Sequence, residues 1–244
     1  MKLLLLAGTA EARALAARLS GDRRFEVTAT LAGATRQPED YAVQVRVGGF
    51  EGDEGLEKYI EENAIEVVID ATHPFARVMP HRAQAVCARR GLPYLRLERP
   101  PWTPGPEDRW QIVEDAEAAT RVIAPGARVF LATGRRSLQD FAALAEGRAI
   151  VARVIDPPET PFPFPNGEWL VGRPPFAVAD EIRTLRDHAI DVVVAKNAGG
   201  PTDAKLAAAR ALGLPVVMLY RPSPPPGDRV ESVAAALDWL ERLA

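Results

Sequence analysis

The sequence predicts an α/β protein with two domains, each a mostly parallel sheet flanked by helices. Short apolar runs of β type alternate with alanine-rich stretches of helical periodicity along the 244 residues, which is the pattern of successive βα units. Glycine turns follow several of these runs. The alternation stops at the proline-rich residues 99–106, because proline suits neither a helix interior nor an inner strand. We therefore expect one domain over residues 1–98 and a second over residues 99–244.

The first expected domain contains five strands. Its first βα unit is the clearest, with a buried strand at residues 2–7, a turn at Gly8, and a helix at residues 10–19 whose apolar residues recur at helical spacing. The other expected strands span residues 25–31, 43–47, 66–70 and 93–97, and the other expected helices span residues 55–62 and 74–90.

The same alternation resumes after the proline-rich stretch. Strands are expected at residues 128–132, 149–154, 191–195 and 215–219, and helices at residues 137–145, 176–188 and 203–212. An amphipathic helix at residues 232–243 closes the second expected domain. Residues 156–165 and 221–227 are rich in proline and are expected to be surface loops.

Composition argues against several classes of protein. The formal net charge is −3, whereas a general nucleic-acid binder normally carries a clustered basic excess. The N-terminal apolar run ends at Ala7 and is far shorter than the roughly 20 residues that span a bilayer. We therefore expect no nucleic-acid partner, no membrane association and a cytoplasmic location.

Cysteine and histidine are too few and too scattered to predict a metal site. The single cysteine, Cys87, can form no internal disulfide and is expected to be structural. The three histidines show no spacing typical of structural zinc. We expect no metal, and we interpret His81 and His188 as structural.

The turn after the first strand is a candidate phosphate site, because ligands of open parallel sheets bind at the carboxyl ends of the strands. Gly8, Thr9 and Glu11 lie at a helix N-terminus, where N–H groups and the positive end of the helix dipole can hold a phosphate. The turn lacks the GxGxxG pattern, and a plain strand-to-helix turn capped by Thr9 is the alternative.

Gly33, Thr35 and Arg36 follow the second expected strand, where a dinucleotide site meets the adenosine ribose. A guanidinium there can pair with a 2′-phosphate, so this loop favours NADPH over NADH. The alternative is that Arg36 is a solvated loop residue.

Two further strand ends complete the candidate cofactor site. Gly48 and Gly49 end a strand and let a ligand approach the backbone closely. Thr72 and His73 follow the strand at residues 66–70 and precede Pro74, which suits the first turn of a helix. Either side chain could cap that helix, and His73 could instead reach the cofactor or the substrate.

Two loops of the second half combine glycine with a cation. Thr133, Gly134 and Arg135 follow one expected strand. The other loop, after the strand at residues 191–195, contributes Lys196, Asn197, Gly199 and Gly200. Backbone donors together with positive side chains suit a ligand that carries several carboxylates. Either cation alone would more often be a surface charge, but two such loops at one sheet edge favour an anion-binding face.

Five ordered motifs resemble the precorrin-6A reductase family, over nearly the whole chain. They are residues 8–13 (GTAEAR), 45–50 (VRVGGF), 70–76 (DATHPFA), 131–135 (LATGR) and 196–200 (KNAGG). Residues 205–210 and 215–218 and the Arg221-Pro222 pair also fit. The sequence departs from the family at Ala34, where arginine is frequent, and at Ala198, where serine is common.

The resemblance implies two Rossmann-like domains with NADPH and a corrin precursor bound in a cleft between them. It implies reduction of one double bond of precorrin-6A, or of its cobalt complex, to precorrin-6B in cobalamin biosynthesis. The hydride would come from the nicotinamide, so the protein must align two flat ligands, and no strong general acid need appear.

The resemblance and the loop patterns together divide the candidate residues between the two ligands. For NADPH they are Gly8, Thr9, Glu11, Gly33, Thr35, Arg36, Gly48, Gly49, Thr72 and His73. For the macrocycle they are Arg13, Thr133, Gly134, Arg135, Lys196, Asn197, Gly199 and Gly200. Lys196 is in addition the candidate catalytic residue, as an electrostatic helper or proton source.

Two other functions stay open at this point. One is a tetrapyrrole methyltransferase that uses S-adenosylmethionine, which predicts no affinity for NADPH. The other is a nucleotide-sensing module without catalysis, which predicts cofactor binding without turnover. The sequence leaves the metal content of the macrocycle and the oligomeric state undecided, and it is compatible with a monomer.

Overall fold

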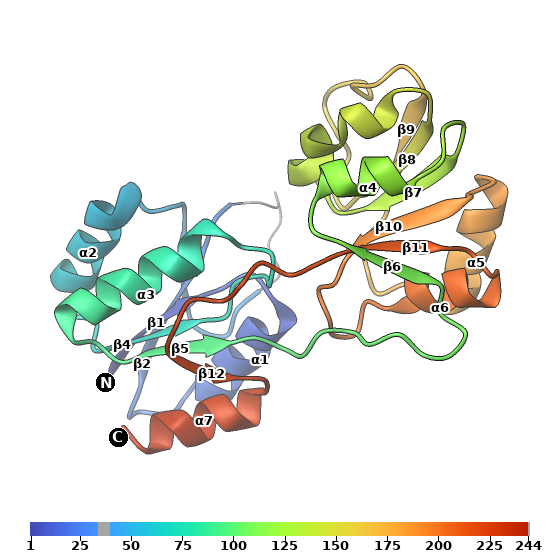
Figure 1. The fold of residues 1–244 in the computed structure, drawn as a ribbon. Coiled ribbons are helices and arrows are strands. Elements are labelled where there is room, and N and C mark those ends of the chain that lie inside the picture. The colour runs from blue at the N-terminus through green and yellow to red at the C-terminus, as the bar shows by residue number, and fades with distance from the viewer. Residues whose placement is uncertain (34–39, 244) are drawn as a thin grey trace. The chain divides into compact units, whose positions relative to one another are not determined.

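The protein consists of two compact units in a computed structural model that describes residues 1–33 and 40–243 (Figure 1). The first unit comprises Met1–Pro100 and Pro222–Ala244, and the second comprises Pro101–Arg221. Each unit contains one six-stranded sheet in which every pair of neighbouring strands is parallel. The predicted α/β fold with two Rossmann-like domains is therefore confirmed.

The sheet of the first unit has the strand order β12-β5-β4-β1-β2-β3. Its strands are β1 (Lys2–Leu6), β2 (Glu26–Leu31), β3 (Gln44–Val47), β4 (Val67–Asp70), β5 (Tyr94–Leu97) and β12 (Asp228–Val230). Helices α1 (Ala10–Leu19) and α7 (Val233–Glu241) pack their apolar residues on one face. Helices α2 (Gly52–Glu62) and α3 (Val78–Arg90) cover the other face.

The sheet of the second unit has the strand order β6-β11-β10-β7-β8-β9. Its strands are β6 (Trp110–Val113), β7 (Arg128–Ala132), β8 (Ala149–Val154), β9 (Gly167–Val171), β10 (Val192–Lys196) and β11 (Val216–Leu219). Helices α5 (Val178–Asp187) and α6 (Ala204–Ala211) lie on one face. The other face carries α4 (Ala116–Val122) and the 3₁₀ segments η1 (Arg135–Phe141) and η2 (Ala143–Ala145) (Figure 1).

The C-terminal segment corrects the expected domain boundary. Residues 222–244 belong to the first unit, whereas the sequence analysis assigned residues 99–244 to the second domain. The physical reason is that β12 pairs in parallel with β5. Ala236, Trp239 and Leu240 of α7 are also buried in the core around β1 and α1. The C-terminal helix was correctly expected, but it packs on the first sheet.

Several local expectations also differ from the structure. Strands β6, β9 and β12 and helix α4 were not predicted from the sequence. The helix expected at residues 137–145 is instead the pair of 3₁₀ segments, and the helix expected from residue 74 begins at Val78. Local capping agrees with the sequence elsewhere, since Thr9 caps α1 and Ser232 caps α7 through their side-chain oxygens.

Cys87 lies in α3 with no exposed surface. Burial raises the pKa of its thiol to about 12, so the thiol stays protonated at neutral pH. Within residues 1–33 and 40–243, no group of three or more His, Cys, Asp and Glu side chains could hold a metal ion. The same residues contain no helix with the length and apolar character needed to cross a membrane.

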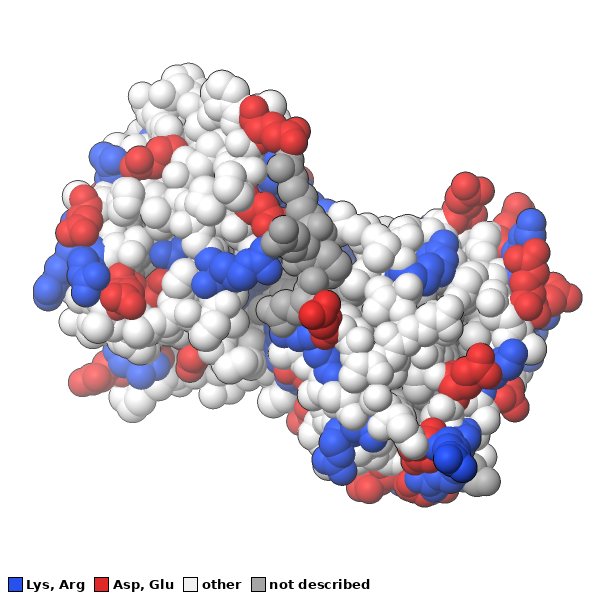
Figure 2. All heavy atoms as spheres, turned by 180° about the vertical axis from the view of Figure 1, so that it is seen from behind, with Lys and Arg blue, Asp and Glu red and all other residues white. Residues whose placement is uncertain are grey.

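Acidic and basic side chains are interspersed on the surface drawn in Figure 2. On that face, Lys and Arg residues lie beside Asp and Glu residues and do not form one continuous basic area. The mixture agrees with the formal net charge of −3.

Candidate functional site

The carboxyl ends of four neighbouring strands form the candidate cofactor edge of the first unit. Strands β4, β1, β2 and β3 are adjacent in this order. The loops that follow them contain Thr72, Gly8, Gly33 and Gly48, so the structure brings together four of the predicted loops. Thr35 and Arg36, which were predicted to bind the adenosine ribose and its phosphate, lie outside the described residues.

The turn between β1 and α1 leaves room for a ligand. Gly8 has a φ of +134°, and a Cβ added there would meet no atom within 4 Å. Thr9 is buried, and its Oγ1 accepts a hydrogen bond from the Ala12 N–H (3.2 Å) and donates to the Ala71 carbonyl (2.8 Å). Thr9 therefore ties the start of α1 to the end of β4 and fixes the helix N-terminus at this edge.

Glu11, in the first turn of α1, is paired with a cation. Its Oε2 lies 2.6 Å from the Arg99 guanidinium, and both side chains are largely buried. A carboxylate near a phosphate would repel it, and Arg99 balances that charge. Arg99 begins the proline-rich residues 99–106, and this pair was not predicted from the sequence.

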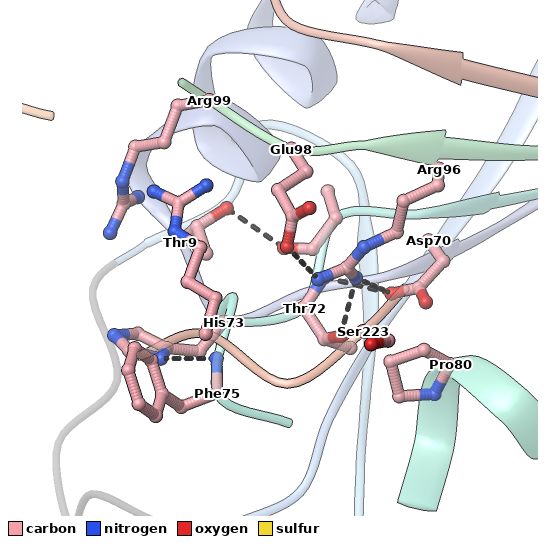
Figure 3. A network of polar contacts seen from close by, with 12 residues as sticks. Thr9, Asp70, Thr72, His73, Phe75, Pro80, Arg96, Glu98, Arg99 and Ser223 are labelled. Atoms are coloured by element: carbon pink, nitrogen blue, oxygen red, sulfur yellow. Dashed lines mark hydrogen bonds and ion pairs between the residues drawn. The ribbon is translucent and has the colours of Figure 1, made fainter. Parts of the chain in front are cut away.

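A buried ion-pair network lies beside the predicted Thr72 loop (Figure 3). Arg96 is 2% exposed and donates to Asp70 (2.7 Å), to Glu98 (3.0 Å) and to the Thr72 hydroxyl (2.8 Å). The Tyr94 hydroxyl donates to the other Asp70 oxygen (2.8 Å). Asp70 also accepts the Thr72 N–H (2.9 Å). The network therefore fixes both the backbone and the side chain of Thr72.

Burial and neighbouring charges shift the pKa values of Tyr94 and Arg96 in this network. Burial raises the pKa of Tyr94 well above its usual value, and the neighbouring Asp70 carboxylate raises it further. For Arg96, burial acts to lower the pKa, but the Asp70 and Glu98 carboxylates outweigh burial and raise it. Arg96 stays charged and Tyr94 stays neutral, so the hydrogen bonds persist over the physiological pH range.

His73 is exposed at the same edge. Its Nδ1 accepts a hydrogen bond from the Phe75 N–H (3.2 Å), and the two rings are tilted toward each other with centroids 6.1 Å apart (Figure 3). Because Nδ1 accepts, the neutral imidazole carries its proton on Nε2. The ring is thus oriented by its own loop, and its contact with a ligand stays a prediction.

Arg46 fixes the turn at Gly48 and Gly49. Its guanidinium donates to the Gly48 carbonyl (2.7 Å) and to the Gly49 carbonyl (3.0 Å), and it lies 4.5 Å from the centroid of the Phe50 ring. Gly48 has a φ of +126°, which side chains other than glycine rarely adopt. The two glycines were predicted from the sequence, whereas the role of Arg46 was not.

The predicted macrocycle residues meet at the carboxyl edge of the second sheet, with the exception of Arg13, which lies in α1 of the first unit. Strands β7 and β10 are neighbours. The Lys196 ammonium donates to the Ser137 hydroxyl (3.1 Å), which itself donates to the Thr133 carbonyl (2.8 Å). Arg135 is exposed at the start of η1. Ser137 was not among the predicted residues.

The Asn197 side chain is engaged within the protein. Its Oδ1 accepts the Trp102 N–H (2.8 Å), and its Nδ2 donates to the Trp102 carbonyl (3.0 Å). The Trp102 indole N–H donates to the Gly200 carbonyl (2.8 Å), and Arg221 donates to the Asn197 carbonyl (2.6 Å). Asn197 therefore organises the loop, and Gly199 and Gly200 keep positive φ angles in it.

Two more cations lie in the second unit and were missed from the sequence. Lys205 is half-buried, and its ammonium lies 4.9 Å from the centroid of the Trp102 ring. Burial lowers the pKa of Lys205 to about 8. Arg153 is ion-paired with the buried Glu181 and lies over the Phe176 ring. A charged residue inside the apolar β8 stretch was the available signal for Arg153.

The sequence and the fold of this chain are similar to those of known proteins over nearly their full length. The model of the family described as precorrin-6x reductase CbiJ/CobK matches residues 2–241. Precorrin-6A reductase of Rhodococcus erythropolis is 44% identical over 99% of this chain and 98% of its own length. The Rhodobacter capsulatus precorrin-6A reductase is 43% identical over 98% and 95%. The solved structure of a CobK precorrin-6A reductase has a TM-score of 0.92 at 42% identity and covers 99% of this chain and 96% of that one. This chain therefore belongs to the precorrin-6x reductase family.

Proposed function

We propose that this chain catalyses the NADPH-dependent reduction of precorrin-6A to precorrin-6B in cobalamin biosynthesis. The observation that carries the proposal is full-length similarity to proteins named precorrin-6A reductase, five of which are 41–44% identical to this chain. Three proteins named cobalt-precorrin-6A reductase are 29–30% identical. We therefore infer that the metal-free macrocycle is the substrate.

The first unit has features that suit a dinucleotide. The open space at Gly8 and the N-terminus of α1 would accept the pyrophosphate. The ordered Thr72 and the exposed His73 lie at the same edge and would contact the rest of the cofactor. The remaining proposed cofactor residues are Thr9, Glu11, Gly33, Thr35, Arg36, Gly48 and Gly49.

The second unit has features that suit the acid side chains of a corrin precursor. Arg135 is exposed, and Lys196 lies at the end of β10 beside the loop after β7. We propose that these cations, with Thr133 and the loop Asn197–Gly200, bind the macrocycle, and that Arg13 contributes from α1. Charge-assisted hydrogen bonds to carboxylates are stronger than neutral ones, so a few such contacts would orient the ring.

The reaction requires the side chains mainly to position the two ligands and to balance the charge of the carboxylates. NADPH, when bound, supplies the hydride that reduces the macrocycle double bond. The protein would contribute by holding the nicotinamide and the ring carbon at contact distance and by balancing the carboxylates. Lys196 is the residue that we propose for electrostatic help or proton delivery.

Anaerobic incubation with NADPH and either precorrin-6A or its cobalt complex tests the proposal. We expect loss of the nicotinamide absorbance with precorrin-6A, together with a product two hydrogens heavier by mass spectrometry. Methyl transfer from S-adenosylmethionine, without any NADPH binding, would support the methyltransferase alternative instead. NADPH binding without turnover of either macrocycle would support the sensing module.

A further inference from the structure

Thr133 presents a buried hydroxyl that lacks a partner. The residue is 6% exposed, and its Oγ1 has no hydrogen-bond partner within the described part of the chain. Native proteins satisfy most buried polar groups, because an unpaired one costs folding free energy. A hydroxyl that remains unpaired at the carboxyl edge of a parallel sheet is placed where such sheets bind ligands.

The sheet register places Thr133 and Lys196 at the same level, at the carboxyl ends of β7 and β10. Ala132 of β7 pairs with Ala195 of β10, and Thr133 and Lys196 are the residues that directly follow them in the sequence. Ala195 packs in the core on the α5 and α6 face. Because side chains alternate along a strand, Lys196 points to the opposite face, where its ammonium bonds to Ser137 of η1. Thr133 directly follows β7 and leads into η1.

Ser137 connects these two residues. Its hydroxyl is 8% exposed, donates to the Thr133 carbonyl (2.8 Å) and approaches the Gly134 carbonyl (3.2 Å). A hydroxyl has a single hydrogen to donate, so toward Lys196 it acts as an acceptor, at 3.1 Å from Nζ. Ser137 thereby connects the Lys196 ammonium to the backbone of Thr133, the residue whose hydroxyl is unpaired.

We propose that Thr133 and Lys196 form one subsite that binds a carboxylate side chain of the macrocycle, with Ser137 as a positioning residue for Lys196. The inference rests on the proposed function. An ammonium and a hydroxyl offer two donors to the two carboxylate oxygens, which is the arrangement that a charged acceptor favours. Neither donor need take part in the hydride transfer.

The Thr133→Val variant tests whether the Thr133 hydroxyl contacts the ligand or stabilises the fold. The valine side chain has nearly the same shape and removes only a hydroxyl that has no partner, so we expect the Tm to stay the same or rise. The Kd for precorrin-6A, measured by anaerobic calorimetry, should rise about fivefold. The Kd for NADPH should not change.

Thr120→Val is the matched control in α4 of the same unit. Its hydroxyl donates to the Ala116 carbonyl (2.9 Å), so the control should lower the Tm and leave the Kd for precorrin-6A unchanged. If Thr133→Val leaves the Kd for precorrin-6A unchanged, the subsite is wrong, and a fall in the Tm like that of the control would then show that the hydroxyl is structural.

A double-mutant cycle tests the role of Ser137. Ser137→Ala should raise the Kd and the KM for precorrin-6A about fivefold or more in the wild-type background. In the Lys196→Ala background the same change should have no further effect, because there is no ammonium left to position. Equal effects in both backgrounds would overturn the positioning role. Since the Kd is measured without turnover, a protein that binds precorrin-6A but does not reduce it would refute the proposed function and still test the subsite.

Discussion

Arg96→Met should strongly destabilise the first unit. Arg96 bridges the buried carboxylates of Asp70 and Glu98, with N···O distances of 2.7 and 3.0 Å, and also donates to Thr72. Removal of one partner from a buried ion pair costs about 3–5 kcal/mol, because the remaining charge is left without compensation. The lost hydrogen bond to Thr72 adds about 1 kcal/mol. We therefore expect a loss of about 4 kcal/mol or more at neutral pH.

Urea unfolding measures this loss, and hydrogen exchange in β4 and β5 assigns it to the first unit. Arg82→Met is the control, since the Arg82 ion pair with Asp53 (2.9 Å) is partly exposed and should contribute less than about 1 kcal/mol. The Arg96 variant should also bind NADPH more weakly, because Thr72 loses its support. If the two variants lose equal stability, the network does not hold the fold and the reasoning from burial is wrong.

Four other predictions concern single side chains. Gly8→Val should abolish NADPH binding in a protein that remains folded by circular dichroism, because a branched side chain would enter the open space at that turn and would also disfavour the φ of +134° there. Arg36→Ala should reduce the affinity for NADPH to that for NADH in calorimetric titrations, and an equal loss for both cofactors would contradict its phosphate role. Lys196→Ala should lower kcat/KM for precorrin-6A about tenfold to a hundredfold and leave NADPH affinity unchanged. Burial lowers the pKa of Lys205 from 10.5 to about 8, so the unfolded chain binds more protons between these values and stability rises with pH there. Lys205→Met should lose that rise in urea midpoints recorded across the same range.

The inner strands of both sheets could be predicted, whereas three of the outermost strands could not. Strands buried on both faces read as continuous apolar runs, and β1 and β4 are of this kind. Strands β6, β9 and β12 lie at sheet edges and are mostly exposed. They are only three to five residues long and contain polar residues, so their apolar signal is weak. The return of the chain to the first sheet depends on the pairing of β12 with β5, which no local pattern encodes.

Residues of the candidate site could be predicted where their role depends on the local conformation of their own loop. They could not be predicted where the role depends on a partner that is distant in the sequence. The glycine turns at Gly8 and Gly48 were found because positive φ angles leave a sequence signal. Arg96 was missed, although a charged residue in the buried run Tyr94–Leu97 requires a partner and was a usable signal. Ser137 gave no such signal, because its importance comes from the approach of Lys196 across the sheet.

The loop at Asn197 shows why a predicted ligand contact and an observed structural role must be separated. The chain passes between its two units at Pro100–Pro101 and at Arg221–Pro222, and both Trp102 and Arg221 hydrogen-bond to this loop. The Asn197 amide is engaged through both its oxygen and its nitrogen with the Trp102 backbone. Loss of that amide would therefore disturb the anchoring of the Trp102 segment before it removed any contact to a ligand. Direct ligand contacts from this loop are then expected from Lys196 and from the backbone at Gly199, for which the positive φ angle is required.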